Sequence, residues 1–211
     1  KTEAIRHGQD VDFNVEMGAV TTPSQYKTID TQLKDALKKG AKVVATSKPT
    51  AHTKGGNFFP ATLVTNVNHK MELMREETFG PILPVMKFDS EEEAIRLAND
   101  STMGLTASVW TKNTKRAKKL APRLQAGVVT INDHLYTHGL SETAWGGFKQ
   151  SGLGRTHGAA GLEEMTQPQV VNWDLLTPPR NLWWFPFSPE TYDALKAALY
   201  FSSPLSAVNW V

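Results

Sequence analysis

The chain has 211 residues, of which 40% are hydrophobic and 21% are charged, and its formal net charge is +2. This is the composition of a globular protein with one sizeable core, and so small a positive charge argues against a dedicated nucleic-acid-binding protein. No cysteine is present, which excludes a disulfide framework, a thiolate zinc site and a thiol nucleophile within these residues.

The first half of the chain alternates between helix and strand signals. Thr22 begins a predicted helix, whose amphipathic stretch covers residues 26–39 and ends at Gly40 as a C-cap. Residues 42–46 and 62–67 are short runs with many β-branched side chains. We expect each of these two runs to form a strand.

The next elements continue this alternation. Ser90 caps a predicted helix that ends at Asn99 and carries three glutamates in its first turn. A strand at residues 106–111, a helix at 114–124 and a strand at 128–131 follow. This order predicts an α/β fold with a mainly parallel sheet flanked by helices.

A long segment rich in glycine, histidine and serine covers residues 132–158. Loops of this length inside a domain are uncommon and often functional. Within it, residues 152–158 resemble a dinucleotide-binding fingerprint, but the third glycine falls one residue late and a loop precedes it rather than a strand. We interpret this stretch as a turn before a helix at residues 159–165.

The C-terminal residues differ in composition from the rest. Residues 169–173 predict a last strand, four aromatic side chains crowd together between Trp183 and Phe187, and Pro189 begins an amphipathic helix that ends at Tyr200. Because this helix has few basic residues, we expect it to cover a binding site or to pack on a partner subunit rather than to lie on a membrane. No apolar run is long enough to span a bilayer, and the first residues do not resemble a signal peptide.

The segment EETFGP at residues 76–81 is the most informative in the chain. A carboxylate can accept two hydrogen bonds from a cis-diol, as a ribose presents. In extended backbone, an aromatic ring two residues later lies on the same side and can stack on a flat heterocycle. For these residues alone, the plainer interpretation is favoured: an acidic helix end followed by a core phenylalanine and a turn.

Four further motifs accompany this segment in order along the chain. They are GGNFFP at residues 55–60, GLTASVWT at 104–111, GVVTIN at 127–132 and WGGFKQSGLGR at 145–155. With EETFGP, the ordered set resembles the aldehyde dehydrogenase superfamily, from about Arg6 to Trp173. The resemblance implies the C-terminal part of the family's catalytic domain, followed by a C-terminal strand and a helical tail.

The resemblance also divides the chain into three parts. Residues 1–166 correspond to a partial catalytic domain, and residues 167–174 to a strand that in many members extends a sheet across a subunit interface. A homo-oligomer is therefore expected. Residues 175–211 form an aromatic-rich tail with the amphipathic helix.

The family's motifs assign roles to individual residues. The second glutamate of EETFGP, Glu77, holds the nicotinamide-side ribose, and Phe79 packs beside that ribose and the nicotinamide. Leu105 lines the pocket near the nicotinamide. The residues expected to line the substrate pocket are Trp145, Tyr136, His134 and His138. The last three belong to the loop at residues 132–143 that shapes the substrate tunnel, where packing within the loop or simple surface exposure is an equal alternative.

The activity implied is the NAD(P)-dependent oxidation of an aldehyde to a carboxylic acid through a cysteine thioester. In the family, the cysteine, the general base, the oxyanion-binding asparagine and most of the domain that binds NAD or NADP lie upstream of this region. We therefore expect no catalytic residue in this chain, no turnover by the chain alone, and the missing N-terminal part of the same enzyme as its partner. The start at Lys1 rather than Met is that of a truncated product, although a processed native start looks the same.

Two other interpretations stay open. One is a non-catalytic homologue or assembly module, and the other is an acylating or phosphorylating semialdehyde dehydrogenase. The six histidines show no metal-ligand spacing, so no metal cofactor is expected. The cytosol is the default compartment, with the mitochondrial matrix as the alternative.

Overall fold

The computed structural model describes residues 1–11, 13–50, 53, 55–134, 136–173, 185 and 187–202. The chain divides into two units, residues 1–167 and residues 168–211. The first unit is an α/β structure that contains every predicted site residue.

Helix α1, Pro23–Lys38, begins where the sequence predicts. The hydroxyl of Thr22 accepts a hydrogen bond from the backbone N–H of Gln25 at 3.2 Å, which satisfies one of the free donors of the first turn. The helix ends because Gly40 has a φ of +97°, a left-handed conformation that a residue with a Cβ rarely adopts.

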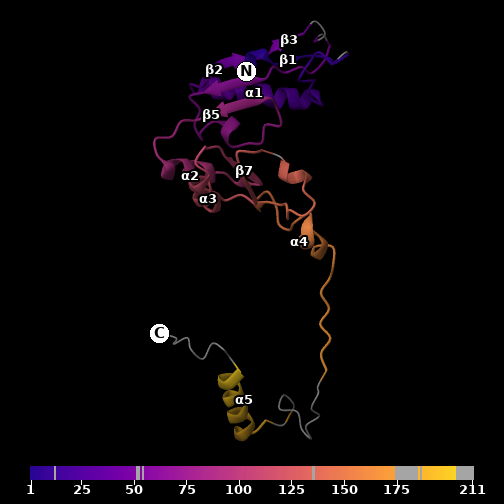
Figure 1. The fold of residues 1–211 in the computed structure, drawn as a ribbon, viewed down its shortest axis with the longest axis vertical. Coiled ribbons are helices and arrows are strands. Elements are labelled where there is room, and N and C mark those ends of the chain that lie inside the picture. The colour runs from indigo at the N-terminus through magenta and orange to yellow at the C-terminus, as the bar shows by residue number, and fades with distance from the viewer. Residues whose placement is uncertain are drawn as a thin grey trace. The chain divides into compact units, whose positions relative to one another are not determined.

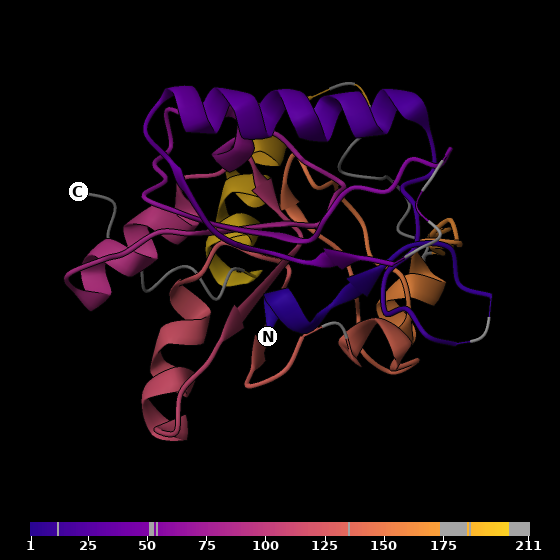
Figure 2. The same ribbon diagram turned by 90° about the horizontal axis from the view of Figure 1, so that it is seen from above.

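A three-stranded sheet in the order β2-β4-β5 runs beside α1 (Figures 1 and 2). β2, Lys42–Thr46, is antiparallel to β4, Thr62–Thr65, whereas β4 is parallel to β5, Ile82–Val85. β5 is not predicted from the sequence, because Pro84 interrupts a run of only four residues. Its parallel partner β4 supplies the hydrogen bonds that make it a strand.

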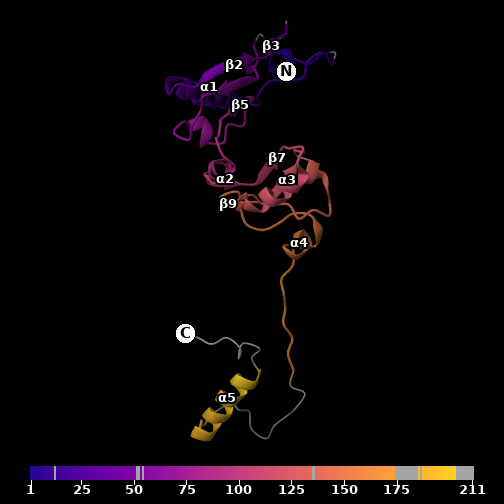
Figure 3. The same cartoon turned by 60° about the vertical axis from the view of Figure 1, so that its left-hand side comes forward.

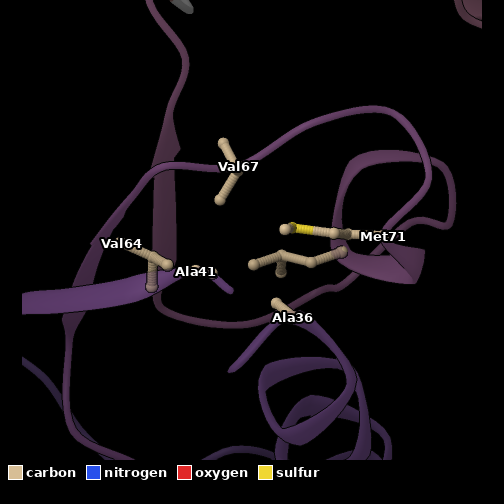
Figure 4. Close-up of a cluster of buried hydrophobic side chains, with 6 residues drawn as sticks. Ala36, Ala41, Val64, Val67 and Met71 are labelled. Atoms are coloured by element: carbon tan, nitrogen blue, oxygen red, sulfur yellow. The ribbon is translucent and has the colours of Figure 1, made fainter. Parts of the chain in front are cut away.

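The core of this region forms where the end of α1 meets β4 and the segment after it. Burial of one valine or methionine side chain contributes roughly 1.5–3 kcal/mol. The buried side chains point toward one another (Figure 4) and are those of Ala36, Ala41, Val64, Val67 and Met71. Met71 is the N-cap of η2, Glu72–Met74, so the core also fixes the segment that leads into EETFGP.

The remaining strands of the first unit form three two-stranded sheets. Two of these sheets contain the strands labelled β7 and β9 in Figure 3. β7, Thr106–Val109, is parallel to β8, Val128–Ile131, and β6, Met103–Gly104, is antiparallel to β9, Phe148–Lys149. The helices here are α2, Glu91–Asn99, α3, Thr114–Leu120, and α4, Gly158–Glu163. The other short elements of the unit are η1, Thr2–Ala4, β1, Arg6–His7, β3, Lys48–Pro49, η3, Ala121–Arg123, and η4, Tyr136–Gly139.

The predicted α2 and β8 are confirmed, α2 with Ser90 as its cap. The helix predicted at residues 114–124 is shorter: the α-helix ends at Leu120 and continues as the 3₁₀ helix η3. The physical reason is Pro122, which has no backbone N–H to continue the α-helical ladder.

The prediction of one mainly parallel sheet needs a correction. Three of the five strand pairs in the described residues are parallel, but the strands form four small sheets. No described strand belongs to more than one of these sheets. Repeated helix and strand signals could not reveal this, because they do not specify which strands pair.

The second unit is described only in part. Helix α5, Pro189–Ser202, covers the predicted helix, whereas Trp183 and Trp184 lie outside the described residues. The strand predicted at residues 169–173 is not formed in this single chain. A strand requires a hydrogen-bonded partner, and the side chains of Val170 and Trp173 are exposed. The role of residues 167–174 in oligomerisation therefore stays a prediction.

Within the described residues, no helix combines the length and the apolar character needed to cross a bilayer.

Candidate functional site

The EETFGP segment forms an exposed loop between η2 and β5. The side chains of Glu77 and Phe79 are both exposed, the latter to 73%. The interpretation of Phe79 as a core residue is therefore wrong. The premise of extended backbone is also wrong, because Phe79 has a φ of +43°, a left-handed conformation that costs free energy in a non-glycine residue.

Helix α1 holds the second half of this loop. The side-chain Nε2 of Gln25 donates hydrogen bonds to the carbonyl oxygens of Thr78, at 2.5 Å, and Phe79, at 3.1 Å. Gly80 lies so close to Ile29 that a Cβ at this position would overlap the Ile29 side chain. These contacts fix the backbone on which Phe79 is presented.

Gln25 is a site residue that the sequence prediction missed. Thr22 and Gln25 have the spacing of a capping box, in which the glutamine side chain would turn back to the N-cap backbone. In the structure that side chain instead reaches across to residues more than 50 positions away. The local pattern could have indicated a hydrogen-bonding role, but not the partner.

The GGNFFP motif borders the same helix end. The backbone N–H of Val20 donates to the carbonyl oxygen of Asn57 at 2.9 Å, and the ring of Phe59 contacts that of Tyr26 edge-on at 5.2 Å. A cavity of about 250 Å³ beside them is lined by Val20, Thr21, Thr22, Gln25 and Phe79. Two of the five motifs thus meet at the start of α1.

The other three motifs meet in a second region of the unit. Gly127 lies so close to Gly146 that a Cβ on Gly127 would overlap the Gly146 carbonyl. The backbone N–H of Gly104 donates to Ser151 Oγ at 2.9 Å. Leu105 follows Gly104, is about one-third exposed, and its carbonyl accepts a hydrogen bond from the N–H of Val128.

Two of the predicted substrate-pocket residues are in contact here. The ring centroids of His138 and Trp145 lie 4.8 Å apart in an edge-to-face arrangement, which is a favourable geometry for aromatic rings. His157, which was not predicted as a site residue, joins them with its ring 5.7 Å from that of His138. The backbones of Trp145 and Thr156 exchange two hydrogen bonds, and this pairing brings His157 to the cluster.

Tyr136 and His134 do not join this cluster through any ring contact of the described chain. Tyr136 lies in η4 and its side chain is 69% exposed. His134 is also exposed, and its Nδ1 lies 3.5 Å from the hydroxyl of Ser108. Simple surface exposure, the alternative interpretation, describes both positions in this chain.

The two regions are not joined into one site by the residues that the structure describes. No hydrogen bond, ring contact or cavity lining among them links the loop of Glu77 and Phe79 to the His138–Trp145 cluster. A separate, mostly apolar cavity of about 670 Å³ lies among α2, β7 and α3, and none of the predicted site residues lines it.

The groups at the Glu77 loop fit a cofactor ribose and ring. In the described part of the chain, the Glu77 carboxylate forms no hydrogen bond or ion pair, and the Phe79 ring is largely uncovered. Both are therefore available to a ligand from outside. The described residues include no group of three or more histidine, aspartate and glutamate side chains that could hold a metal ion.

Comparisons with known proteins agree with the ordered motifs. The model of the aldehyde dehydrogenase family matches residues 1–171. The 4,4'-diapolycopene aldehyde oxidase of Methylomonas sp is 41% identical over 186 residues, which are 88% of this chain and 34% of that protein. The betaine aldehyde dehydrogenase of Bacillus subtilis is 35% identical, and the match covers 82% of this chain and 37% of that protein.

A solved structure gives the same result. Betaine aldehyde dehydrogenase from Staphylococcus aureus, in complex with NAD+, is 37% identical and superposes with a TM-score of 0.70 over 81% of this chain and 36% of that one. The chain thus spans about a third of the length of the relatives it matches. With the family model covering residues 1–171, the chain belongs to the aldehyde dehydrogenase family.

Proposed function

We propose that these residues are the C-terminal part of the catalytic region of an NAD(P)-dependent aldehyde dehydrogenase. The complete enzyme, meaning the longer polypeptide that we propose to contain them, oxidises an aldehyde to a carboxylic acid through a cysteine thioester. Its nucleophile lies outside this chain, which contains no cysteine. The proposal is supported by the family match over residues 1–171 and by the chain's span of about a third of its relatives.

The observation that carries the proposal is the exposed, unpaired carboxylate of Glu77 beside the exposed ring of Phe79. In our proposal, Glu77 accepts hydrogen bonds from the hydroxyls of the nicotinamide-side ribose, and Phe79 packs beside that ribose. Leu105 lines the pocket near the nicotinamide. When bound, the cofactor supplies the hydride acceptor; the residues of this chain orient it.

The substrate side of the site is proposed to include Trp145, His138, His134 and Tyr136. Contact between the rings of His138 and Trp145 supports a shared wall for these two. His134 and Tyr136 have exposed side chains in this chain, which leaves them free to face a substrate. A non-catalytic assembly module has no need of a strained backbone that presents Phe79 to solvent, so the enzyme is favoured.

The match to the diapolycopene aldehyde oxidase bears on the class of aldehyde. It includes 186 residues of a 211-residue chain, so it must reach residue 186 or beyond, whereas the family model ends at residue 171. Part of the aromatic-rich tail is therefore shared with a relative named for an apolar polyene aldehyde. We infer that the complete enzyme prefers large apolar aldehydes. Its kcat/KM should then be higher for a long-chain or polyene aldehyde than for betaine aldehyde.

The experiment that tests the function compares Glu77→Gln with Glu76→Gln in the complete enzyme. Hydrogen bonds to a charged group are worth about 1.5–3 kcal/mol, which corresponds to roughly a 10- to 100-fold change. Glu77→Gln should raise KM for the cofactor or lower kcat by about this factor, whereas Glu76→Gln should have little effect. Unchanged kinetics for Glu77→Gln would falsify the assignment of this residue.

A first check is the intact mass of the purified protein under denaturing conditions. A single species near 23.3 kDa should show no aldehyde-dependent reduction of NAD or NADP. A longer or second chain that contains a cysteine should restore this activity. Turnover by the 23.3 kDa species alone would contradict the proposal that the nucleophile lies elsewhere.

A further inference from the structure

The guanidinium of Arg75 connects three segments of the first unit. Its Nε donates to the carbonyl oxygen of His69 at 2.8 Å. Its Nη1 donates to the carbonyl oxygen of Asp100 at 2.8 Å, and its Nη2 donates to the Asp100 carboxylate at 3.0 Å. The planar fork of an arginine can satisfy these acceptors at the same time, whereas the single ammonium of a lysine cannot reproduce their geometry.

Asp100 is a firm anchor for this fork. It is the C-cap of α2, and its backbone N–H donates to the carbonyl oxygen of Leu97. A cation at this end of a helix is also favoured by the helix dipole. His69 Nδ1 lies 2.6 Å from the Asp100 carboxylate, and the hydrogen bonds from His69 and Arg75 lower the pKa of Asp100, so the carboxylate keeps its charge.

Arg75 directly precedes the EETFGP loop. The backbone N–H of Glu76 donates to the carbonyl oxygen of Glu72 at 2.8 Å, so the loop leaves η2 without a flexible connection. Gln25 holds the loop from the other side, at the carbonyls of Thr78 and Phe79. Glu77 therefore lies between two residues whose positions are held by hydrogen bonds: Arg75 before it, and Thr78, bound by Gln25, after it.

We propose that Arg75 is a positioning residue for the cofactor site: through its fork to His69 and Asp100, it sets where the Glu77 carboxylate lies. The inference rests on the proposed function of Glu77. Arg75 itself contacts no cofactor atom. Its side chain is 41% exposed, and exposed ion pairs add little to global stability, so the effect should be local to the loop.

The test in the complete enzyme uses two ligands that differ in one ribose. ADP-ribose contains the nicotinamide-side ribose, and ADP does not, so their difference in affinity reports the contacts with that ribose, including the one proposed for Glu77. Arg75→Met should weaken binding of ADP-ribose by about tenfold, since small displacements of a binding group have large effects, and should leave binding of ADP unchanged. Isothermal titration calorimetry measures both.

The matched control is Arg123→Met. Arg123 also pairs with a carboxylate, that of Glu92, and its side chain has the same exposed fraction of 41%. Its described hydrogen bonds join it to Glu92 and Asn99 and not to residues 76–81. This variant should change neither affinity. If Arg75→Met leaves both affinities unchanged, or weakens both equally, the proposal is overturned. Affinity for ADP-ribose that is fully retained in Arg75→Lys would also overturn the proposal, because a positive charge without the planar fork would then be enough to position Glu77.

A second measurement uses the 211-residue chain and needs no cofactor. Hydrogen–deuterium exchange should be faster in a peptide that covers residues 76–81 in Arg75→Met than in the parent or in Arg123→Met, because local opening governs exchange. Unaltered exchange at residues 76–81 in Arg75→Met would show that the hydrogen bonds of Arg75 do not hold the loop. If instead exchange rises in Arg75→Met while the unsubstituted complete enzyme binds ADP-ribose no more tightly than ADP, Arg75 does hold the loop. The ribose-binding role of Glu77 then fails.

Discussion

Two loops of the first unit present the predicted site residues by different physical means. The loop at residues 76–81 is short. The side chain of Gln25 holds its backbone, and the guanidinium of Arg75, the residue before it, donates to the carbonyl oxygen of Asp100. The loop at residues 132–158 is long, and it is held by glycine contacts, by backbone pairing at Trp145 and by the rings of two histidines. The first arrangement holds the backbone from which a carboxylate and a ring extend into solvent, whereas the second brings backbones closer than a Cβ would permit.

From this comparison, we expect the largest loss in the free energy of unfolding for a substitution at Gly127. A Cβ there would overlap the backbone carbonyl of Gly146, and backbone cannot move aside as the end of a side chain can. Gly127→Ala should therefore lower the free energy of unfolding by about 3 kcal/mol, at the upper end of the usual cost of overpacking. Urea unfolding followed by circular dichroism measures this loss.

The control for Gly127 is Gly139→Ala, within the long loop whose Gly146 carbonyl lies against Gly127. A Cβ at Gly139 would meet no atom within 4 Å, so the change should stay within about 0.5 kcal/mol. Equal stability of the two variants would show that close backbone approach does not hold the long loop.

A smaller effect is expected where side chains hold the short loop. Gln25→Met keeps much of the side-chain volume but removes both hydrogen bonds to the carbonyls of Thr78 and Phe79. We expect a loss of about 1 kcal/mol in the free energy of unfolding and faster amide exchange at residues 76–81. The exposed Gln167 offers a control, and an effect of Gln167→Met as large as that of Gln25→Met would contradict this prediction.

The smallest effect should come from acid, through the carboxylate of Asp100 that pairs with Arg75. Asp100 has a pKa lowered below 3.8 by His69 and then by Arg75. Its contribution to stability is thus complete above that value and is lost as the pH falls through the lower, folded-state pKa. The difference in unfolding free energy between the parent and Asp100→Asn should shrink as the pH is lowered from 5 to 2.5. A difference independent of pH would show that the ionised carboxylate is not what anchors Arg75.

Much of the first unit follows from local signals in the sequence. The start of α1 at Thr22, its end before Gly40 and the cap of α2 at Ser90 are determined by groups within a few residues of one another. The motif order also identified the family that the comparisons show. The site roles of Glu77, Phe79, Leu105 and the substrate-pocket residues remain proposals.

Only the tertiary structure decided how these segments meet. Gln25 satisfies a capping-box spacing yet bonds to Thr78 and Phe79, and Phe79, whose backbone is left-handed at this anchor, has an exposed side chain. His157 reaches His138 through backbone pairing of Thr156 with Trp145. A sequence signal such as a cap or a periodic pattern acts over one or two turns of chain, whereas these contacts join residues brought together by the packing of separate elements. The sequence by itself therefore determined the local elements and the family, and the packing decided which side chains are fixed, exposed and free to bind.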